Sequence, residues 1–161
     1  MTTLDVAGAG TRARPARNPW LIAGGWLSVA AALLHLGAIA GGPEWYRFFG
    51  AGEGIARAAE RGEWTPALLT TGIAAILAVW AAYAFAGAGL LRRLPLMRTG
   101  LVAISAIYLG RGLLIIPVII NVPYASAPFD YWSSLIVLIY GITYAVGTWI
   151  AWPGLSQRKT A

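Results

Sequence analysis

The sequence lacks the residues on which several kinds of metal and cofactor site depend. It has no cysteine and a single histidine, His35, among 161 residues. The absence of cysteine excludes a disulfide relay, a thiolate nucleophile, an iron–sulfur centre and cysteine-ligated zinc. One histidine cannot supply both axial ligands of a bis-histidine haem, and only a symmetric dimer would add a second. We therefore expect neither a metal nor a cofactor.

Two further absences restrict the chemistry of the chain. The only lysine, Lys159, lies near the end of the C-terminal tail, so a Schiff base inside a membrane span is excluded. Every aspartate and glutamate falls in a tail or a connection, which leaves His35 without a carboxylate in any span. An enzyme needs a base held beside a nucleophile or a metal. A membrane enzyme is therefore the third of the function classes we consider.

Apolar sequence is what the chain has in abundance. Hydrophobic residues make up 58% of it and charged residues only 11%. Four stretches of roughly 20 apolar residues are each long enough to cross about 30 Å of hydrocarbon as a helix. They predict an all-α integral membrane protein built as a bundle of four transmembrane helices. The expected spans cover residues 20–40, 66–91, 99–120 and 131–152.

The spans are expected to form one domain, residues 20–152, between a flexible basic tail at 1–19 and a second tail at 153–161. Pro153 and Gly154 are expected to end the last helix. Residues 38–40 resemble a signal-peptidase site, so cleavage after the first span is an alternative. The first apolar run exceeds the roughly 7 to 15 residues of a signal-peptide core, which favours a retained span.

The net charge of +6 comes from short basic clusters beside the spans. Because no basic face of a soluble domain is present, the charge does not indicate nucleic acid as a partner. The clusters precede the first span, separate the second from the third, and follow the fourth. The positive-inside rule then places both termini in the cytoplasm. We expect the protein in the inner (plasma) membrane of a bacterium, with membrane lipids as partners.

The connection between the first two spans, residues 41–65, is expected to form an amphipathic, aromatic loop on the outer side. Aromatic residues crowd around Glu44 and Arg47, glycines follow at 50–54, and residues 55–61 have the pattern of a short amphipathic helix. Such segments lie in the membrane interface. We therefore expect this connection to form a lid that lies on the membrane surface. The glycines lack the lysine and the spacing of a phosphate-binding loop.

Arg111 is the only charge predicted inside a span. Counted from Thr99, it lies about 18 Å into the third span, where an arginine costs roughly 2.5 to 3.5 kcal/mol to insert. Gly110 and Gly112 leave room beside its guanidinium, and Tyr108 precedes it by one turn. An arginine at this depth faces a ligand, a partner or a water-filled cavity. The alternative is that it snorkels toward the headgroups.

Polar residues of the other spans complete a candidate ligand site in the outer half of the bundle. We expect a cavity beneath the lid, with Glu53 or Glu44 as the counter-ion. A guanidinium beside tyrosine hydroxyls favours an anionic head, and the apolar surroundings suit a lipid-like tail. Each polar residue could instead bond a neighbouring helix. The predicted ligand-binding residues are Arg111, His35, Tyr108, Tyr140 and Glu53.

Two function classes therefore come before an enzyme. The first is binding or transport of a small anionic or amphipathic ligand at Arg111. The second is a non-catalytic accessory or assembly subunit of a larger membrane complex. Small residues recur every four positions from Ala74 to Ala86, and such stripes let helices approach closely in lipid. The stripe suits packing within the chain, a homodimer face or a larger complex.

Overall fold

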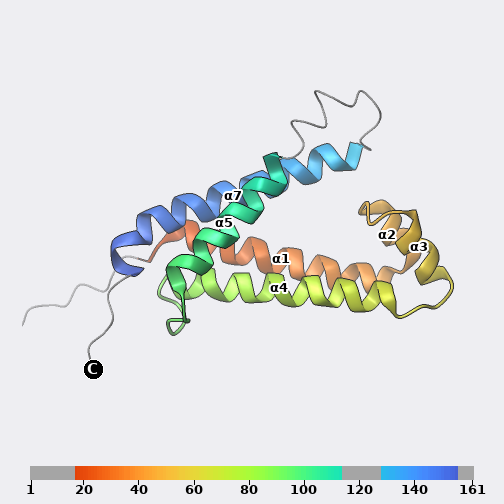
Figure 1. Ribbon diagram of the computed structural model, residues 1–161, viewed down its shortest axis with the longest axis horizontal. Helices are drawn as coiled ribbons and strands as arrows, with labels where there is room; N and C mark the ends of the chain where they lie inside the picture. Colours follow the sequence, from red (N-terminus) through yellow and green to blue (C-terminus); the bar gives the residue numbers. More distant parts are fainter. Residues whose placement is uncertain (1–16, 114–127, 156–161) are drawn as a thin grey trace, which may run out of the picture.

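The computed structural model describes residues 17–113 and 128–155, and this part of the chain is all-α, with six helices and no strand (Figure 1). The expected N-terminal tail up to residue 16, the end of the third span with the connection after it (114–127), and the tail from residue 156 lie outside the described residues.

The first long helix, α1, runs from Pro19 to Gly41 and is capped at its start by Asn18. The Asn18 side-chain oxygen accepts hydrogen bonds from the backbone N–H groups of Trp20 (3.1 Å) and Leu21 (3.3 Å). Asparagine at the N-cap followed by proline is a favourable helix start, because proline needs no hydrogen-bond partner for its nitrogen there. The expected span at 20–40 thus corresponds to a helix one residue longer at each end.

The cap between α1 and the next long helix consists of two short helices, α2 (Pro43–Phe48) and α3 (Glu53–Glu60). Gly50 and Gly52, both with positive φ, separate them. We call the end of the molecule that carries α2 and α3 the cap end, and the opposite end the basic end.

The second long helix, α4, runs from Thr65 to Gly87, four residues short of the expected end at 91. Gly89 has a φ of 77°, and the N–H of Leu90 turns back to the carbonyl of Phe85 at 2.9 Å. A left-handed glycine closes a helix in this way. The apolar residues beyond Gly87 therefore belong to a turn and not to the helix.

The remaining long helices are α5 (Met97–Leu113) and α7 (Pro128–Leu155). The expectation that Pro153 and Gly154 end the last helix was wrong, because α7 continues through both to Leu155. One arginine at the start of α5 and another in the connection before it explain how the end of α7 is held. Arg98 donates to the carbonyl of Trp152 at 3.0 Å and lies 4.4 Å from the centre of its ring, and Arg93 donates to the carbonyl of Gly154. These bonds satisfy carbonyls that a helix end leaves free.

The four long helices pack as two pairs, α1 with α4 and α5 with α7, and the pairs meet mainly through α1 and α7. Leu21, Leu101 and Tyr144 are fully buried where the pairs meet. Glycines permit the close approach, since a Cβ at Gly147 would lie 3.0 Å from the backbone nitrogen of Leu21. Figure 1 shows the pairs diverging toward the cap end.

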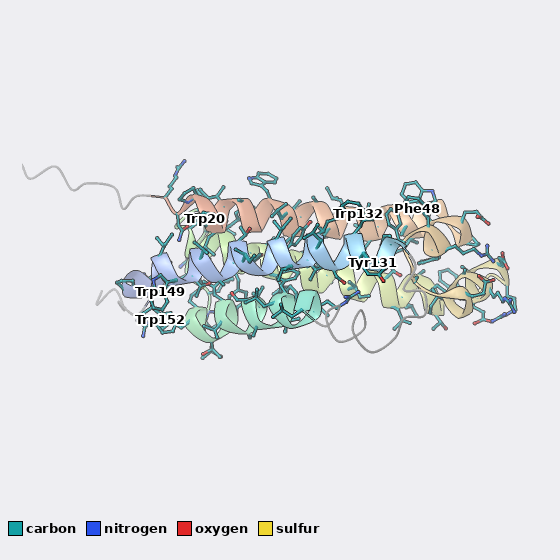
Figure 2. The ribbon with its side chains drawn as sticks, turned by 90° about the horizontal axis from the view of Figure 1, so that it is seen from above. Trp20, Phe48, Tyr131, Trp132, Trp149 and Trp152 are labelled. Atoms are coloured by element: carbon teal, nitrogen blue, oxygen red, sulfur yellow. The ribbon has the colours of Figure 1, made fainter. Side chains whose placement is uncertain are left out.

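Three described helices are long and apolar enough to cross a membrane: α1, α4 and the Tyr131–Leu155 part of α7. Large apolar side chains remain exposed along their outer faces, which is unfavourable in water and suits lipid. Exposed aromatic residues gather at both ends of the molecule, as they do at membrane interfaces (Figure 2). Those labelled there are Trp20, Trp149 and Trp152 at the basic end, and Phe48, Tyr131 and Trp132 at the other. The structure thus indicates membrane association.

Candidate functional site

A chain of buried hydroxyl groups connects all four long helices near the middle of the bundle. The Ser28 hydroxyl lies 2.8 Å from the hydroxyl of Tyr144 and 3.1 Å from that of Tyr108. The Tyr144 hydroxyl donates to the backbone carbonyl of Trp80 at 3.1 Å. Ser28 and Tyr144 have no exposed surface, and Tyr108 is 5% exposed. We call Ser28, Tyr108 and Tyr144 the hydroxyl chain.

The direction of the hydroxyl chain follows from proton counting. Each hydroxyl has one hydrogen to donate, and a carbonyl oxygen only accepts. Because Tyr144 donates to Trp80, Ser28 must donate to Tyr144, and Tyr108 must then donate to Ser28. Hydrogen bonds in one continuous direction polarise and strengthen one another.

Tyr140 extends this polar region along the contact between α5 and α7. Its ring meets that of Tyr108 edge to face, with the ring centres 5.5 Å apart. Closer to the cap end, α5 and α7 nearly touch: a Cβ added at Gly112 would lie 2.8 Å from the Cα of Leu138. The two predicted tyrosines are therefore brought together, and the helices that carry them have no room to spare at this point.

Arg111 directly precedes Gly112, near the described end of α5. Its guanidinium donates to the hydroxyl of Ser134 on α7 at 3.2 Å, and its side chain is exposed in the single chain. Among the side chains that the structure describes, no carboxylate lies within 4.0 Å of it. Arg111 thus pairs with a neutral partner across the α5–α7 contact.

His35 does not join Arg111 or the tyrosines through any hydrogen bond between described residues. Its Nδ1 lies 2.8 Å from the carbonyl of Ala31, one turn earlier in α1. A carbonyl accepts only, so Nδ1 carries the proton and Nε2 is the nitrogen left for another partner. The side chain is half-buried. His35 is thus held by a bond within its own helix.

Glu53 belongs to an ionic cluster that ties α2 to α3. Arg47 is the centre of the cluster and donates to Glu44 (2.9 Å), Glu53 (3.1 Å) and Glu60 (2.6 Å). Arg47 bonds both carboxylate oxygens of Glu53, and Arg57 adds a third hydrogen bond to Glu53 at 3.0 Å. These bonds from Arg47 and then Arg57 lower the pKa of Glu53 to about 2, and the bonds from Glu53 and Glu60 raise the pKa of Arg47. Glu53 therefore stays ionised at neutral pH, with two arginines as its partners.

The structure thus places the predicted residues at four positions. Tyr108 and Tyr140 pack together in the bundle, Arg111 follows Tyr108 by one turn and bonds α7, and His35 and Glu53 each have partners nearby. Ser28 and Tyr144 were not among the predicted residues, and no local sequence pattern shows that they meet across α1 and α7. No protein-family model, curated protein or solved structure matches the chain.

Proposed function

We propose that the protein is a small membrane protein of four spans that binds or transports a small anionic or amphipathic ligand at Arg111. The proposal rests on the identity of the hydrogen-bond partner of Arg111. Its described partner is the neutral hydroxyl of Ser134, although a charge at membrane depth is costly when it has no counter-charge. An anionic group on a ligand would supply that counter-charge.

The surroundings of Arg111 favour an amphipathic ligand over a simple ion. A guanidinium can hold a carboxylate or phosphate with two parallel hydrogen bonds. Exposed apolar side chains of α5 and α7, including Ile107, Leu135 and Ile139, offer surface for an attached chain. Tyr108 and Tyr140 lie deeper in the same contact between helices. We therefore name lipids and fatty acids as the ligand class.

Native mass spectrometry in mild detergent tests the proposal. It measures how well the protein retains phosphatidylglycerol and how tightly it binds decanoate. Replacing a charge-assisted hydrogen bond of about 1.5 to 3 kcal/mol by a neutral one weakens binding about 10- to 100-fold. We expect this loss for Arg111→Gln, and a smaller one for Arg111→Lys, which keeps the charge but loses the planar contact. Arg92→Gln is the matched control, since Arg92 is exposed at the basic end.

Equal binding by the wild type, Arg111→Gln and Arg92→Gln would overturn the proposal. The second candidate, an accessory or assembly subunit, would then come first. It is supported by the small exposed residues Ala103, Ala106 and Gly110, which share one face of α5. Partner chains that copurify in fixed stoichiometry, and are lost in Ala106→Leu, would support it.

Both candidates place the termini in the cytoplasm of a bacterium, with the cap end outward. The basic residues of the 88–96 connection lie at the same end as the last turn of α7, which supports one basic side. The chain has no cysteine, so single labelling sites are simple to introduce. In cells, Ala51→Cys should react with an impermeant maleimide, and Arg92→Cys should react only after permeabilisation. The opposite pattern would reverse the orientation.

A further inference from the structure

Helix α2 and the residue that follows it carry three aromatic side chains and one carboxylate that border the same space. Trp45, Phe48 and Phe49 follow one another at helical spacing, and Glu44 precedes Phe48 by one turn. Between them Tyr46 is buried, at 4% exposure, so it fixes which side of α2 faces inward. Phe48 is 72% exposed and Trp45 44%. These four residues, Glu44, Trp45, Phe48 and Phe49, line one cavity of about 450 Å³, which we call the aromatic cage.

The rings of the aromatic cage are set at steep angles to one another. Phe48 and Phe49 have their centres 5.0 Å apart and their planes at 85°, and Trp45 and Phe49 have theirs 5.7 Å apart at 60°. If the rings were stacked in parallel on one another, a ligand would contact the face of only one ring. Rings set at steep angles allow the negative faces of different rings to border the same space, as a compact cation requires.

The cage is positioned from both sides by glycines and by a neighbouring helix. A Cβ at Gly41 would collide with the Trp45 ring, and one at Gly37 would lie 3.5 Å from it. On the other side, the ring of Phe129 in α7 packs 6.1 Å from that of Phe49, and a Cβ at Gly50 would lie 2.7 Å from Phe129. The cage is thus anchored to α1 and to α7.

The charge around the cage favours a cation. Arg47 is the nearest positive side chain in the sequence, but its guanidinium is shared by Glu44, Glu53 and Glu60. With Arg57, which pairs with Glu53, these five groups sum to a charge of −1. Arg47 bonds one carboxylate oxygen of Glu44, and that side chain is 83% exposed at the edge of the cage. A cation in the cage would therefore meet π faces and a net negative cluster.

We propose that the aromatic cage binds a quaternary ammonium group, either of a soluble cation or of a choline headgroup. Quaternary ammonium has no N–H to donate, so ring faces and a nearby carboxylate are suited to recognise it. A volume of about 450 Å³ exceeds what a trimethylammonium group needs and leaves room for the molecule attached to it. The site is separate from Arg111, which contributes no side chain to its walls.

The test compares choline with 3,3-dimethylbutan-1-ol, which has nearly the same shape and no charge. Binding is measured by saturation-transfer NMR on the protein in phosphatidylglycerol nanodiscs, a bilayer free of quaternary ammonium. We expect choline to bind about fivefold or more tightly than the alcohol. Phe48→Leu should weaken choline binding about fivefold, whereas Phe48→Tyr, which keeps the ring, should bind as the wild type does. Glu44→Gln should also weaken it.

Matched controls separate this site from the general surface and from the proposed function. Trp149→Leu removes an aromatic ring that is 83% exposed at the basic end and should leave choline binding unchanged. Arg111→Gln should leave it unchanged as well. Since Phe48 is largely exposed, its variants are expected to keep the wild-type melting temperature, which is measured alongside.

A second arm distinguishes the two sources of the cation. In this arm, phosphatidylcholine replaces half of the phosphatidylglycerol in the nanodiscs. Loss of free-choline binding then identifies the lipid headgroup as the occupant of the cage. Unchanged binding of free choline identifies a soluble cation. The proposal is overturned if the uncharged alcohol binds as well as choline, if choline does not bind in phosphatidylglycerol nanodiscs, or if folded Phe48→Leu binds with wild-type affinity.

Discussion

Removal of one hydroxyl, by Tyr144→Phe, tests the contribution of the hydroxyl chain to the stability of the bundle. The tyrosine is fully buried, and its ring packs against that of Tyr108 with centres 5.4 Å apart. Phenylalanine retains the ring and leaves no cavity, so the substitution removes two hydrogen bonds and little else. One bond is to Ser28 and the other to the carbonyl of Trp80.

The expected loss is set by hydrogen bonds between membrane helices rather than by those in water. Side-chain bonds between such helices average about 0.6 kcal/mol and reach about 1.7 kcal/mol. Two bonds therefore amount to about 1 to 2 kcal/mol, because Ser28 can still donate to a carbonyl of its own helix one turn back. This corresponds to a change of about 5- to 30-fold in the unfolding equilibrium.

Reversible unfolding in mixed micelles of a mild detergent and dodecyl sulfate measures this loss. Tyr83→Phe is the matched control, since it deletes a hydroxyl that makes one bond, to the carbonyl of Pro95 (3.0 Å), at an exposed position. We expect the control to cost less than about 0.5 kcal/mol, because water replaces an exposed bond. A double-mutant cycle with Ser28→Ala should show a coupling of at least about 0.5 kcal/mol.

Two results would refute this reasoning. If Tyr144→Phe cost no more than Tyr83→Phe, the hydroxyl chain would not hold the helix pairs together. If Ser28→Ala and Tyr144→Phe were additive, the bond between the two residues would have no energetic weight, and the stability would come from packing alone.

Two other predictions concern the helix contact beside Arg111 and the cap. Gly112→Ala should destabilise the bundle by about 1 to 3 kcal/mol in the same unfolding assay, because its Cβ would lie 2.8 Å from the Cα of Leu138. Gly110→Ala is the control and should not destabilise it, because a Cβ there has nothing within 4 Å. Equal effects of the two substitutions would mean that α5 and α7 can separate freely. Because the pKa of Glu53 is lowered from 4.5 to about 2, its ion pairs should stabilise the cap above about pH 4.5 and lose this effect as the pH falls toward 2. The protection factors of the α3 amides, which are corrected for the intrinsic pH dependence of exchange, should then fall over that acidic range and also at high salt. In Glu53→Gln they should be low already at neutral pH. Protection factors independent of pH in the wild type would contradict the cluster's role.

The sequence predicted the all-α class and the long apolar helices because their length and boundary signals are local, but it did not predict the short helix α2. The first apolar run, expected at 20–40, became a helix over 19–41 with an asparagine cap that the Asn18-Pro19 pair indicates. Local signals also explain the misplaced ends. Hydropathy continues past Gly87, but the left-handed Gly89 stops α4, and Pro153 does not stop α7 because Arg98 holds the carbonyl of Trp152. That last contact joins residues 54 positions apart, which no local pattern reveals.

The candidate site was predicted less well because it depends on how helices are rotated against one another. Ser28 and His35 lie on the same face of α1, yet only Ser28 meets the other helix pair. The reason is visible in Figure 1, where α5 and α7 leave α1 as they approach the cap end. His35 is seven residues nearer to that end, at about 1.5 Å per residue, and bonds its own helix instead. The depth of a residue along its span can be counted from the sequence, but the divergence of the two helix pairs cannot be predicted from it.

Because the helix pairs diverge, the two ends of the molecule differ in the contacts that join one pair to the other. Lipid provides no hydrophobic force between helices, so close packing and polar contacts decide where pairs stay together. Toward the basic end α1 and α7 are joined by Ser28 with Tyr144 and by the amide of Asn18, which donates to the carbonyl of Gly147 at 2.7 Å. Toward the cap end the ring of Phe49, at the end of α2, contacts that of Phe129 in α7, and this contact is nondirectional by comparison. Arg111, through its bond to Ser134, and the aromatic cage, through the contact of Phe49 with Phe129, both lie close to the start of α7 at this less constrained end.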